Sequence, residues 1–309
     1  MFGLLGCWAQ NALAEDFFAV RNQNALLRGF YVPLPIDTAL AAPTAVSATW
    51  LVTNTINVER RPHERLLVDG ESSVVDLSVD HALAPSWRYR LSLPIIHDGG
   101  GALDSTIDGW HRAFGLSRSF RPYYPKNQFR YFYDGKSSFD VSRPGTTMGD
   151  VAADFGWYAL DDGHRVFSLW GGFKAPTGSL AGLASDGAWD GALWVHAAIG
   201  GGGWNMGLEA GLSQPFGDEV FAGAAHRTVA FARLAATRTV GSVWSVRGQL
   251  DGQSGRLAGT RLRFLGPSLQ MSLGADRHLG KKWRLQLGFS EDVAVYTAPD
   301  ITFFLGIRR

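Results

Sequence analysis

Apolar and polar residues alternate along most of the chain with a period of two. The clearest run starts at Val46. One set of alternate positions is mostly apolar (Val46, Ala48, Trp50, Val52, Asn54, Ile56, Val58), and the other is mostly polar, with several hydroxyl side chains (Ser47, Thr49, Leu51, Thr53, Thr55, Asn57). Because successive side chains of a β-strand point to opposite faces, this pattern predicts a strand with one apolar and one polar face. The run is long enough to cross a bilayer obliquely.

Further segments follow the same rule, at 75–80, 87–95, 151–157, 167–174, 189–199, 204–212, 244–251, 269–273, 283–289 and 301–308. A water-soluble β-sandwich also alternates, but its polar face is rich in Lys, Glu and Arg. Here that face is mostly Ser, Thr, Gly, Asn and paired charges, and several strands carry Trp or Tyr near one end, which is typical of an aromatic girdle. The pattern therefore favours an all-β fold, a transmembrane antiparallel β-barrel.

The links between these segments alternate in length. Short links are expected near 84–86, 161–164, 200–203, 238–241 and 278–282, and long ones at 59–72, 97–148, 176–187, 214–226, 252–266 and 291–299. Outer-membrane barrels have short periplasmic turns and long outer loops. The count predicts about 12 strands with both termini in the periplasm. A hairpin at Phe129–Tyr133 with the turn Asp134-Gly135 would raise the number to 14.

Two regions do not resemble transmembrane strands. Residues 15–45 contain Pro33, Pro35 and Pro43 and alternate little, so we expect a periplasmic or plug segment there. In 104–115, Asp104 can cap a short loop helix with one shared face, formed by Ile107, Trp110, His111 and Phe114.

Composition agrees with this interpretation. Charged residues make up 18% of the chain, against about 25% in soluble domains, and 38 residues are glycine. A net charge of +1 offers no basic surface for nucleic acid, which we exclude as a partner. We find no apolar run of about 18 residues, as a helical membrane protein would need.

The first 14 residues resemble an export signal. Leu4, Leu5 and Trp8 form an apolar patch, and 12–14 have the A-x-A form of a signal-peptidase site. We expect a signal peptide at 1–14, cleavage after Ala14 and a mature chain of 15–309. The basic residues usual at the start of a signal peptide are missing, so we expect the true translation start to lie upstream. The alternative is a lipoprotein box ending at Cys7, and either interpretation exports the protein.

Scattered motifs resemble the uncharacterised outer-membrane family called domain of unknown function 3187. They comprise Arg21, Asn22 and Asn24; Asn54; Trp110 and His111; Lys174, Pro176, Thr177 and Gly178; and Glu291, Asp292, Pro299 and Asp300. The resemblance covers nearly the whole mature chain, although Ala25 stands where the family usually has proline. It implies a barrel in the outer membrane of a Gram-negative bacterium and supplies no activity.

Catalytic motifs fail on inspection. His63-Glu64 lacks the second histidine of H-E-x-x-H, Gly135-Lys136-Ser137 lacks the first P-loop glycine, and 211–215 lacks the last glycine of a nucleophile elbow. His111 and His196 with Ser or Asp neighbours could form a hydrolytic site. We favour His111 packing on a loop helix and His196 lining the lumen.

Two groups of charged residues stand out. Glu291, Asp292 and Asp300 gather acids at one loop base, which could bind a cation, although we favour a hydrogen-bonded loop brace. Asp76 and Asp80 on one strand face Arg88 and Arg90 on the next, and their apolar neighbours place all four on the lumen face. A charged constriction that screens solutes and a salt-bridge ladder that fills the barrel both follow from this geometry.

Three functions remain open. The first is a passive pore or uptake channel for small solutes, with 15–45 or the 97–148 loop as a partial plug. The second is an enzyme that modifies lipid or lipopolysaccharide, and the third is a structural envelope protein. The channel needs no cofactor or metal. Its expected partners are outer-membrane lipids, the barrel-assembly machinery and an unidentified solute.

Overall fold

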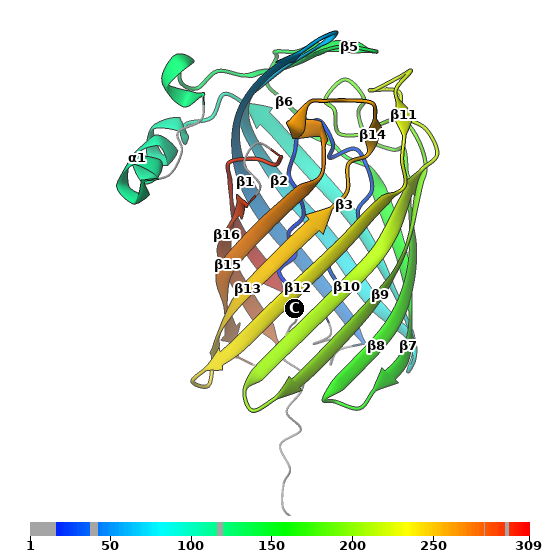
Figure 1. The fold of residues 1–309 in the computed structure, drawn as a ribbon. Helices are drawn as coiled ribbons and strands as arrows, with labels where there is room; N and C mark the ends of the chain where they lie inside the picture. Colours follow the sequence, from blue (N-terminus) through cyan, green and yellow to red (C-terminus); the bar gives the residue numbers. More distant parts are fainter. Residues whose placement is uncertain (1–16, 38–42, 116–119, 281, 294–296) are drawn as a thin grey trace, which may run out of the picture.

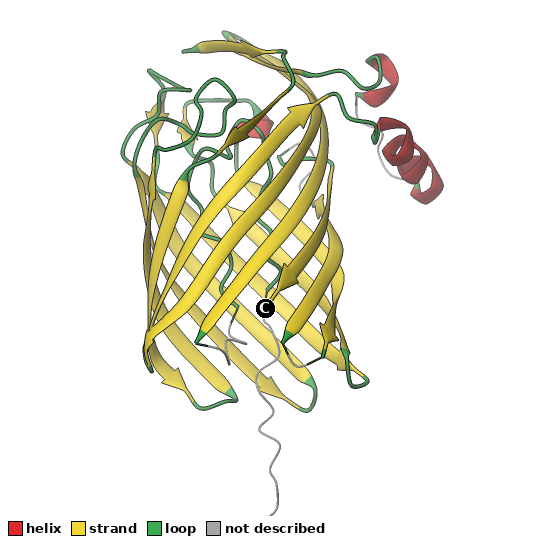
Figure 2. Cartoon of the chain, turned by 180° about the vertical axis from the view of Figure 1, so that it is seen from behind, coloured by secondary structure: helices red, strands yellow, loops and turns green. Residues whose placement is uncertain are grey.

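The computed structural model describes residues 17–37, 43–115, 120–280, 282–293 and 297–309, except for the side chains of Trp110, His111 and Phe114. Within this part of the chain, twelve strands form one closed antiparallel barrel (Figures 1 and 2). The barrel strands are β1 (Thr44–Arg61), β2 (Glu64–Ala84), β3 (Trp87–Gly99), β7 (Val151–Asp161), β8 (Arg165–Ala175), β9 (Asp190–Gly201), β10 (Trp204–Pro215), β12 (Val229–Val240), β13 (Trp244–Gln253), β15 (Ser268–Leu279), β16 (Trp283–Asp292) and β17 (Ile301–Arg308). Pairing of β1 with β17, from Ser47 opposite Arg308 to Asn54 opposite Ile301, closes the barrel. The predicted fold class is confirmed.

The two faces of the wall follow the alternation in the sequence. On β1, Val46 and Trp50 are exposed on the outside, whereas Thr49 and Thr53 are buried inside. On β10, Leu208 is 43% exposed and Asn205 is 2% exposed, so the first faces out and the second faces the lumen. The bilayer therefore contacts the apolar set, and the polar set lines the interior.

This register predicts the effect of a charge placed on the outer face. Leu208→Arg should lower the free energy of unfolding by about 2–4 kcal/mol near the bilayer midplane, because the guanidinium would face hydrocarbon. Urea unfolding in lipid vesicles, followed by the gel mobility of unboiled samples, measures it. An unchanged free energy of unfolding would mean that Leu208 does not face lipid.

Short turns gather at one end of the barrel and long loops at the other. The predicted short links are confirmed, for example between β2 and β3 and between β9 and β10. The predicted long loop at 59–72 is wrong, because β1 and β2 pair without a break up to Arg61 opposite Glu64, with His63 at a positive φ of 67° in the turn. Strands that rise above the membrane lose the apolar alternation but keep their backbone hydrogen bonds, which explains the error.

The remaining elements lie at the outer end. The helix α1 (Asp104–Phe114) lies beside the barrel, which confirms the predicted loop helix (Figure 1). The other elements are η1 (Arg121–Tyr123), β4 (Arg130–Asp134), β5 (Ser138–Val141), β6 (Gly145–Met148), β11 (Ala225–His226), β14 (Leu257–Ala258) and η2 (Arg263–Leu265).

The hairpin predicted within 116–148 exists as β4 and β5, but it does not add to the barrel. β4 pairs with residues 65–69 of β2, in the part of that strand that rises above the barrel. The alternative of 14 strands is therefore wrong.

Among the described residues, no helix is long and apolar enough to cross a membrane. The predicted signal peptide at 1–14 lies outside the described residues, as do the side chains of Trp110 and His111.

Candidate functional site

The interior of the barrel contains residues 17–37, here called the inner segment (Figures 1 and 2). None of its residues is exposed, and Phe18, Asn24 and Ile36 are fully buried. Two prolines, Pro33 and Pro35, and little alternation keep this stretch out of the sheet. Its backbone groups are therefore free to pair with wall side chains instead of with neighbouring strands.

The inner segment crosses the lumen twice. Phe17 and Asp37 both lie at the periplasmic end, where they line one small cavity together with Arg308. Between them the chain reaches the outer end, where the side-chain amide of Asn24 donates to the backbone oxygen of Phe264 at 2.7 Å. A Cβ on Gly29 would stand 2.6 Å from the backbone of Ser185, so the turn and the outer loop 176–189 pack closely enough to require glycine there.

At the outer end, ion pairs hold the turn of the inner segment. Arg28 pairs with Asp98 on β3, and the Nζ atom of Lys174 on β8 donates to the backbone oxygen of Gly29 at 2.6 Å. Lys174 also lies 2.9, 2.5 and 3.2 Å from carboxylate oxygens of Asp150, Asp186 and Asp190, respectively. Asp186 in turn pairs with Arg256 at 2.7 Å, which joins two outer loops to the cluster.

In the middle of the lumen, wall side chains bind the backbone of residues 31–37, the returning limb that leads from the turn back to the periplasmic end. Asp190 accepts from the backbone N–H of Tyr31 at 2.9 Å, and the hydroxyl of that tyrosine donates to Asp154. Arg233 donates to the oxygen of Pro33 at 2.6 Å, and Glu209 accepts from the N–H of Ile36 at 2.6 Å. The wall thus satisfies buried backbone groups that no strand could pair.

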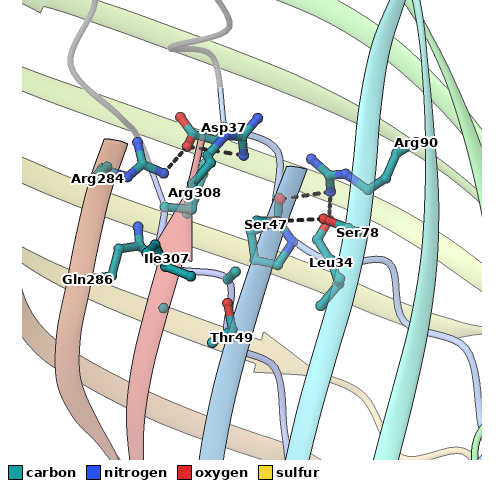
Figure 3. Close-up of a pocket in the computed structure, with 14 residues that line it drawn as sticks. Leu34, Asp37, Ser47, Thr49, Ser78, Arg90, Arg284, Gln286, Ile307 and Arg308 are labelled. Atoms are coloured by element: carbon teal, nitrogen blue, oxygen red, sulfur yellow. Dashed lines mark hydrogen bonds and ion pairs between the residues drawn. The ribbon is translucent and has the colours of Figure 1, made fainter. Parts of the chain in front are cut away.

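At the periplasmic end, arginines from three strands surround the limb (Figure 3). Arg90 donates to the backbone oxygens of Leu34 and Pro35 at 3.0 and 2.9 Å. Arg284 pairs with Asp37, and Arg308 lies 3.4 Å from the same carboxylate. The charges of the inner segment thus complement those of the wall. Asp37 faces Arg284 and Arg308, whereas Arg21 and Arg28 face Asp76 and Asp98.

Little space remains between the inner segment and the wall. The cavity around Asp37 has a volume of about 20 Å³, and a second one around Arg21 and Arg233 has about 10 Å³. Each is about the size needed for one water molecule. Neither cavity can hold a solute, and no residue of the inner segment is exposed, so the described part of the chain fills the lumen.

The predicted lumen charge group lies inside the barrel but divides into separate contacts. Asp80 and Arg90 are opposite each other in register, and their side chains pair at 2.7 Å. Asp76 instead lies 3.6 Å from Arg21 of the inner segment, and Arg88 stacks 5.3 Å from the ring centre of Tyr158.

The first family motif positions the turn of the inner segment. The side chain of Asn22 donates to Ser268 at 3.0 Å and accepts from the backbone N–H of Asn24 at 2.9 Å. Asn24 accepts from the N–H of Leu26 at 3.0 Å. These Asx turns fix the reversal of the chain at the outer end.

Other family motifs brace the outer loops. Arg121 binds Asn54, Asp104 and Asp300 at 2.6, 2.9 and 2.8 Å. In the stretch that includes Pro176, Thr177 accepts from the N–H of Val151 at 2.9 Å, and the N–H of Gly178 donates to Asp150 at 2.8 Å.

The acidic group at 291–300 is dispersed. Asp292 accepts from Thr297 and Ala298 in the loop that leads past Pro299, whereas Asp300 pairs with Arg121. Glu291 lies in strand register opposite Met271 and Ile301. Within the described residues, no three His, Cys, Asp or Glu side chains group as metal ligands would.

His196 lies buried in the lumen, 3.3 Å from Glu209 and in ring contact with Phe17. A lipid outside the wall cannot reach this ring. The geometry therefore gives no support to a lipid-hydrolysing site at His196.

Sequence reasoning missed several residues that hold the inner segment, among them Arg28, Tyr31, Asp190 and Arg233. Asp190 lies on a predicted strand face, so its period-two position could have identified it. Arg233 lies between the predicted links at 214–226 and 238–241, in a stretch for which no strand face was predicted. Arg121, Asp186 and Arg256 lie in loops, and no local pattern indicates their partners.

These features define a class of protein, a closed outer-membrane β-barrel whose own N-terminal segment occupies the lumen. The chain belongs to the family described as "Protein of unknown function (DUF3187)", whose model matches residues 4–309. No curated protein sequence matches it significantly.

Solved structures share the fold. An outer membrane channel from Pseudomonas putida F1 is 14% identical, with a TM-score of 0.59 and coverage of 91% of this chain and 98% of that one. The KdgM porin is more distant, at 7% identity and a TM-score of 0.45, covering 85% of this chain and 97% of the porin.

Proposed function

We propose that this protein is a channel for passive uptake of small solutes across the outer membrane of a Gram-negative bacterium, and that the inner segment is its plug. The observation that carries the proposal is how the lumen is filled. The wall is lined by charged and hydroxyl side chains, and these hold the inner segment largely through hydrogen bonds to its backbone. Such bonds exchange for bonds to water at a modest net cost of about 1 kcal/mol each.

The neighbouring channel from Pseudomonas putida F1 supports the proposal by analogy of fold. We further propose that residues 1–14 are the signal peptide and that the barrel-assembly machinery inserts the mature chain. Mass spectrometry of the exported protein should find Glu15 at the N-terminus, and a diacylated Cys7 would contradict it.

A structural envelope protein is the second candidate, because the lumen is filled. Recordings of the refolded full chain in planar bilayers distinguish the two. We expect discrete steps between a non-conducting level, corresponding to this structure, and a conducting one. If neither the full chain nor a folded variant without the inner segment conducts any current, only the structural role remains.

The charges around Arg90 predict the ion preference of the conducting level. Replacing Arg88 and Arg90 together with Gln should shift the reversal potential under a salt gradient toward cation preference, because Asp80 remains while two bases are lost. Arg130→Gln, in the exposed pair with Asp140 on the outer hairpin, is the matched control and should change nothing. Unchanged selectivity together with lost heat resistance would assign the group to a structural ladder.

A further inference from the structure

Three arginines lie over three tryptophans at the periplasmic end of the wall. The guanidinium of Arg238 is 5.2 Å from the ring centre of Trp204, that of Arg277 is 5.2 Å from Trp244, and that of Arg309 is 5.5 Å from Trp283. Arg238, Arg277 and Arg309 are called the rim arginines below. At each place a cation stacks on an indole that is 39–50% exposed on the outside of the barrel.

The three pairs arise from one repeated arrangement of strands. Each tryptophan is the first residue of a strand that leaves a periplasmic turn, in β10, β13 and β16. Trp204 is opposite Arg238 in register, and Trp244 is opposite Arg277. For the third pair, Arg284 is opposite Arg308, so Trp283, which precedes Arg284, lies next to Arg309. The pairs therefore occupy one continuous side of the barrel, and neighbouring rim arginines are two strands apart, about 10 Å.

The position of these residues is that of the membrane boundary. Exposed apolar residues continue along the same outer face toward the bilayer, such as Met206 two residues after Trp204 and Ile307 two residues before Arg309. Tryptophan at strand ends marks the level of the lipid headgroups. A guanidinium whose face rests on an indole keeps N–H donors at its edge, which suit phosphate oxygens. At Arg238 one of these donors, Nη1, binds the backbone oxygen of Gly202 at 2.7 Å.

This side of the rim holds no exposed acidic side chain among the described residues. Its turns, at 202–203, 241–243 and around Lys282, contain no acid, and the nearby Asp276 is buried in the lumen beside Arg247.

The opposite side is different. In the turn between β7 and β8, Arg165 pairs with Asp162 at 2.7 Å, and this hydrogen bond lowers the pKa of Asp162 to about 2. The positive charge there is balanced within the protein, whereas the rim arginines face the lipid without such a partner.

We propose that the rim arginines form a binding site for anionic phospholipid headgroups, such as phosphatidylglycerol, in the inner leaflet of the outer membrane. The proposal is independent of any solute transport. The indoles hold the three cations at headgroup level, and the phosphates supply the negative charge that this side of the protein lacks.

Quenching of tryptophan fluorescence by brominated lipids tests the site in the full chain reconstituted into vesicles. We expect phosphatidylglycerol to be preferred about fivefold over phosphatidylcholine next to the wall, and high salt should reduce the preference. The triple variant R238Q/R277Q/R309Q should bind the two lipids equally, whereas R238K/R277K/R309K should keep most of the preference because it keeps the charges.

Arg165→Gln is the matched control, since its charge is already paired, and it should leave the preference unchanged. The gel shift of unboiled samples verifies that each variant is folded. Equal binding of both lipids by the unaltered chain, or a preference that survives the triple Gln replacement, would overturn the proposal.

Discussion

Removal of residues 17–37 is expected to turn a barrel that is closed most of the time into one that conducts steadily. The two limbs of the inner segment fill the lumen and leave cavities of only about 20 and 10 Å³ beside them. Every barrel strand keeps its neighbouring strands when the inner segment is removed, because the inner segment is not part of the sheet. Water entering the lumen can solvate Asp76, Asp98 and Arg284, which lose their partners Arg21, Arg28 and Asp37. Planar-bilayer recording measures the open probability.

Two further variants separate the removal of contacts from the shortening of the chain. A glycine-serine stretch of equal length in place of 17–37 should also conduct, because it cannot form the side-chain anchors. The double variant R28Q/D37N loosens only the turn at the outer end and the return of the segment at the periplasmic end, and should give an intermediate open probability. A deletion variant that shows the gel shift of a folded barrel but passes no current would refute the plug.

Lys174→Met should be the most damaging single replacement in the wall. Lys174 is 3% exposed and lies within 3.2 Å of three carboxylates. Its loss takes the paired cation from the buried Asp150 and Asp190, whereas Asp186 keeps Arg256. Breaking such a buried group costs about 3–5 kcal/mol. Urea unfolding of the folded protein, followed by the unboiled gel shift, measures the loss of stability.

Arg65→Gln is the control for this replacement. It breaks a pair with Asp134 that is 57% and 39% exposed, which should cost less than about 1 kcal/mol. Adding Asp190→Asn to Lys174→Met should recover part of the stability, because one unpaired charge is removed. A loss for Lys174→Met no larger than for Arg65→Gln would show that the cluster does not stabilise the barrel.

The strands that cross the bilayer were predictable because the solvent on each face is uniform. Lipid outside and a polar interior impose period two on β1, β10 and β17, and the pattern can be found in any one strand alone. The prediction failed where that constraint ends. Glu59 to Arg65 read as a loop, yet they extend the hairpin of β1 and β2 above the membrane, where strand pairing no longer needs an apolar face.

The site was less predictable, because its contacts join residues far apart in the sequence. Lys174 and Asn24 drew attention through family motifs, but neither motif shows that Gly29 lies against Lys174 or that Phe264 accepts from Asn24. Arg88 and Arg90 were grouped by their spacing. In the structure, Arg90 donates hydrogen bonds to two backbone oxygens of the inner segment, whereas Arg88 stacks on the ring of Tyr158.

The sequence by itself determined the class of fold, the outward and inward faces of the wall and the end at which the turns are short. It did so because each of these depends on local alternation and turn chemistry. Only the tertiary structure decided that residues 17–37 enter the lumen, turn at Gly29 and return to Arg284 and Arg308. That path depends on closing the sheet, since closure brings the charges of distant strands around one axis, and no pattern within a single segment records it.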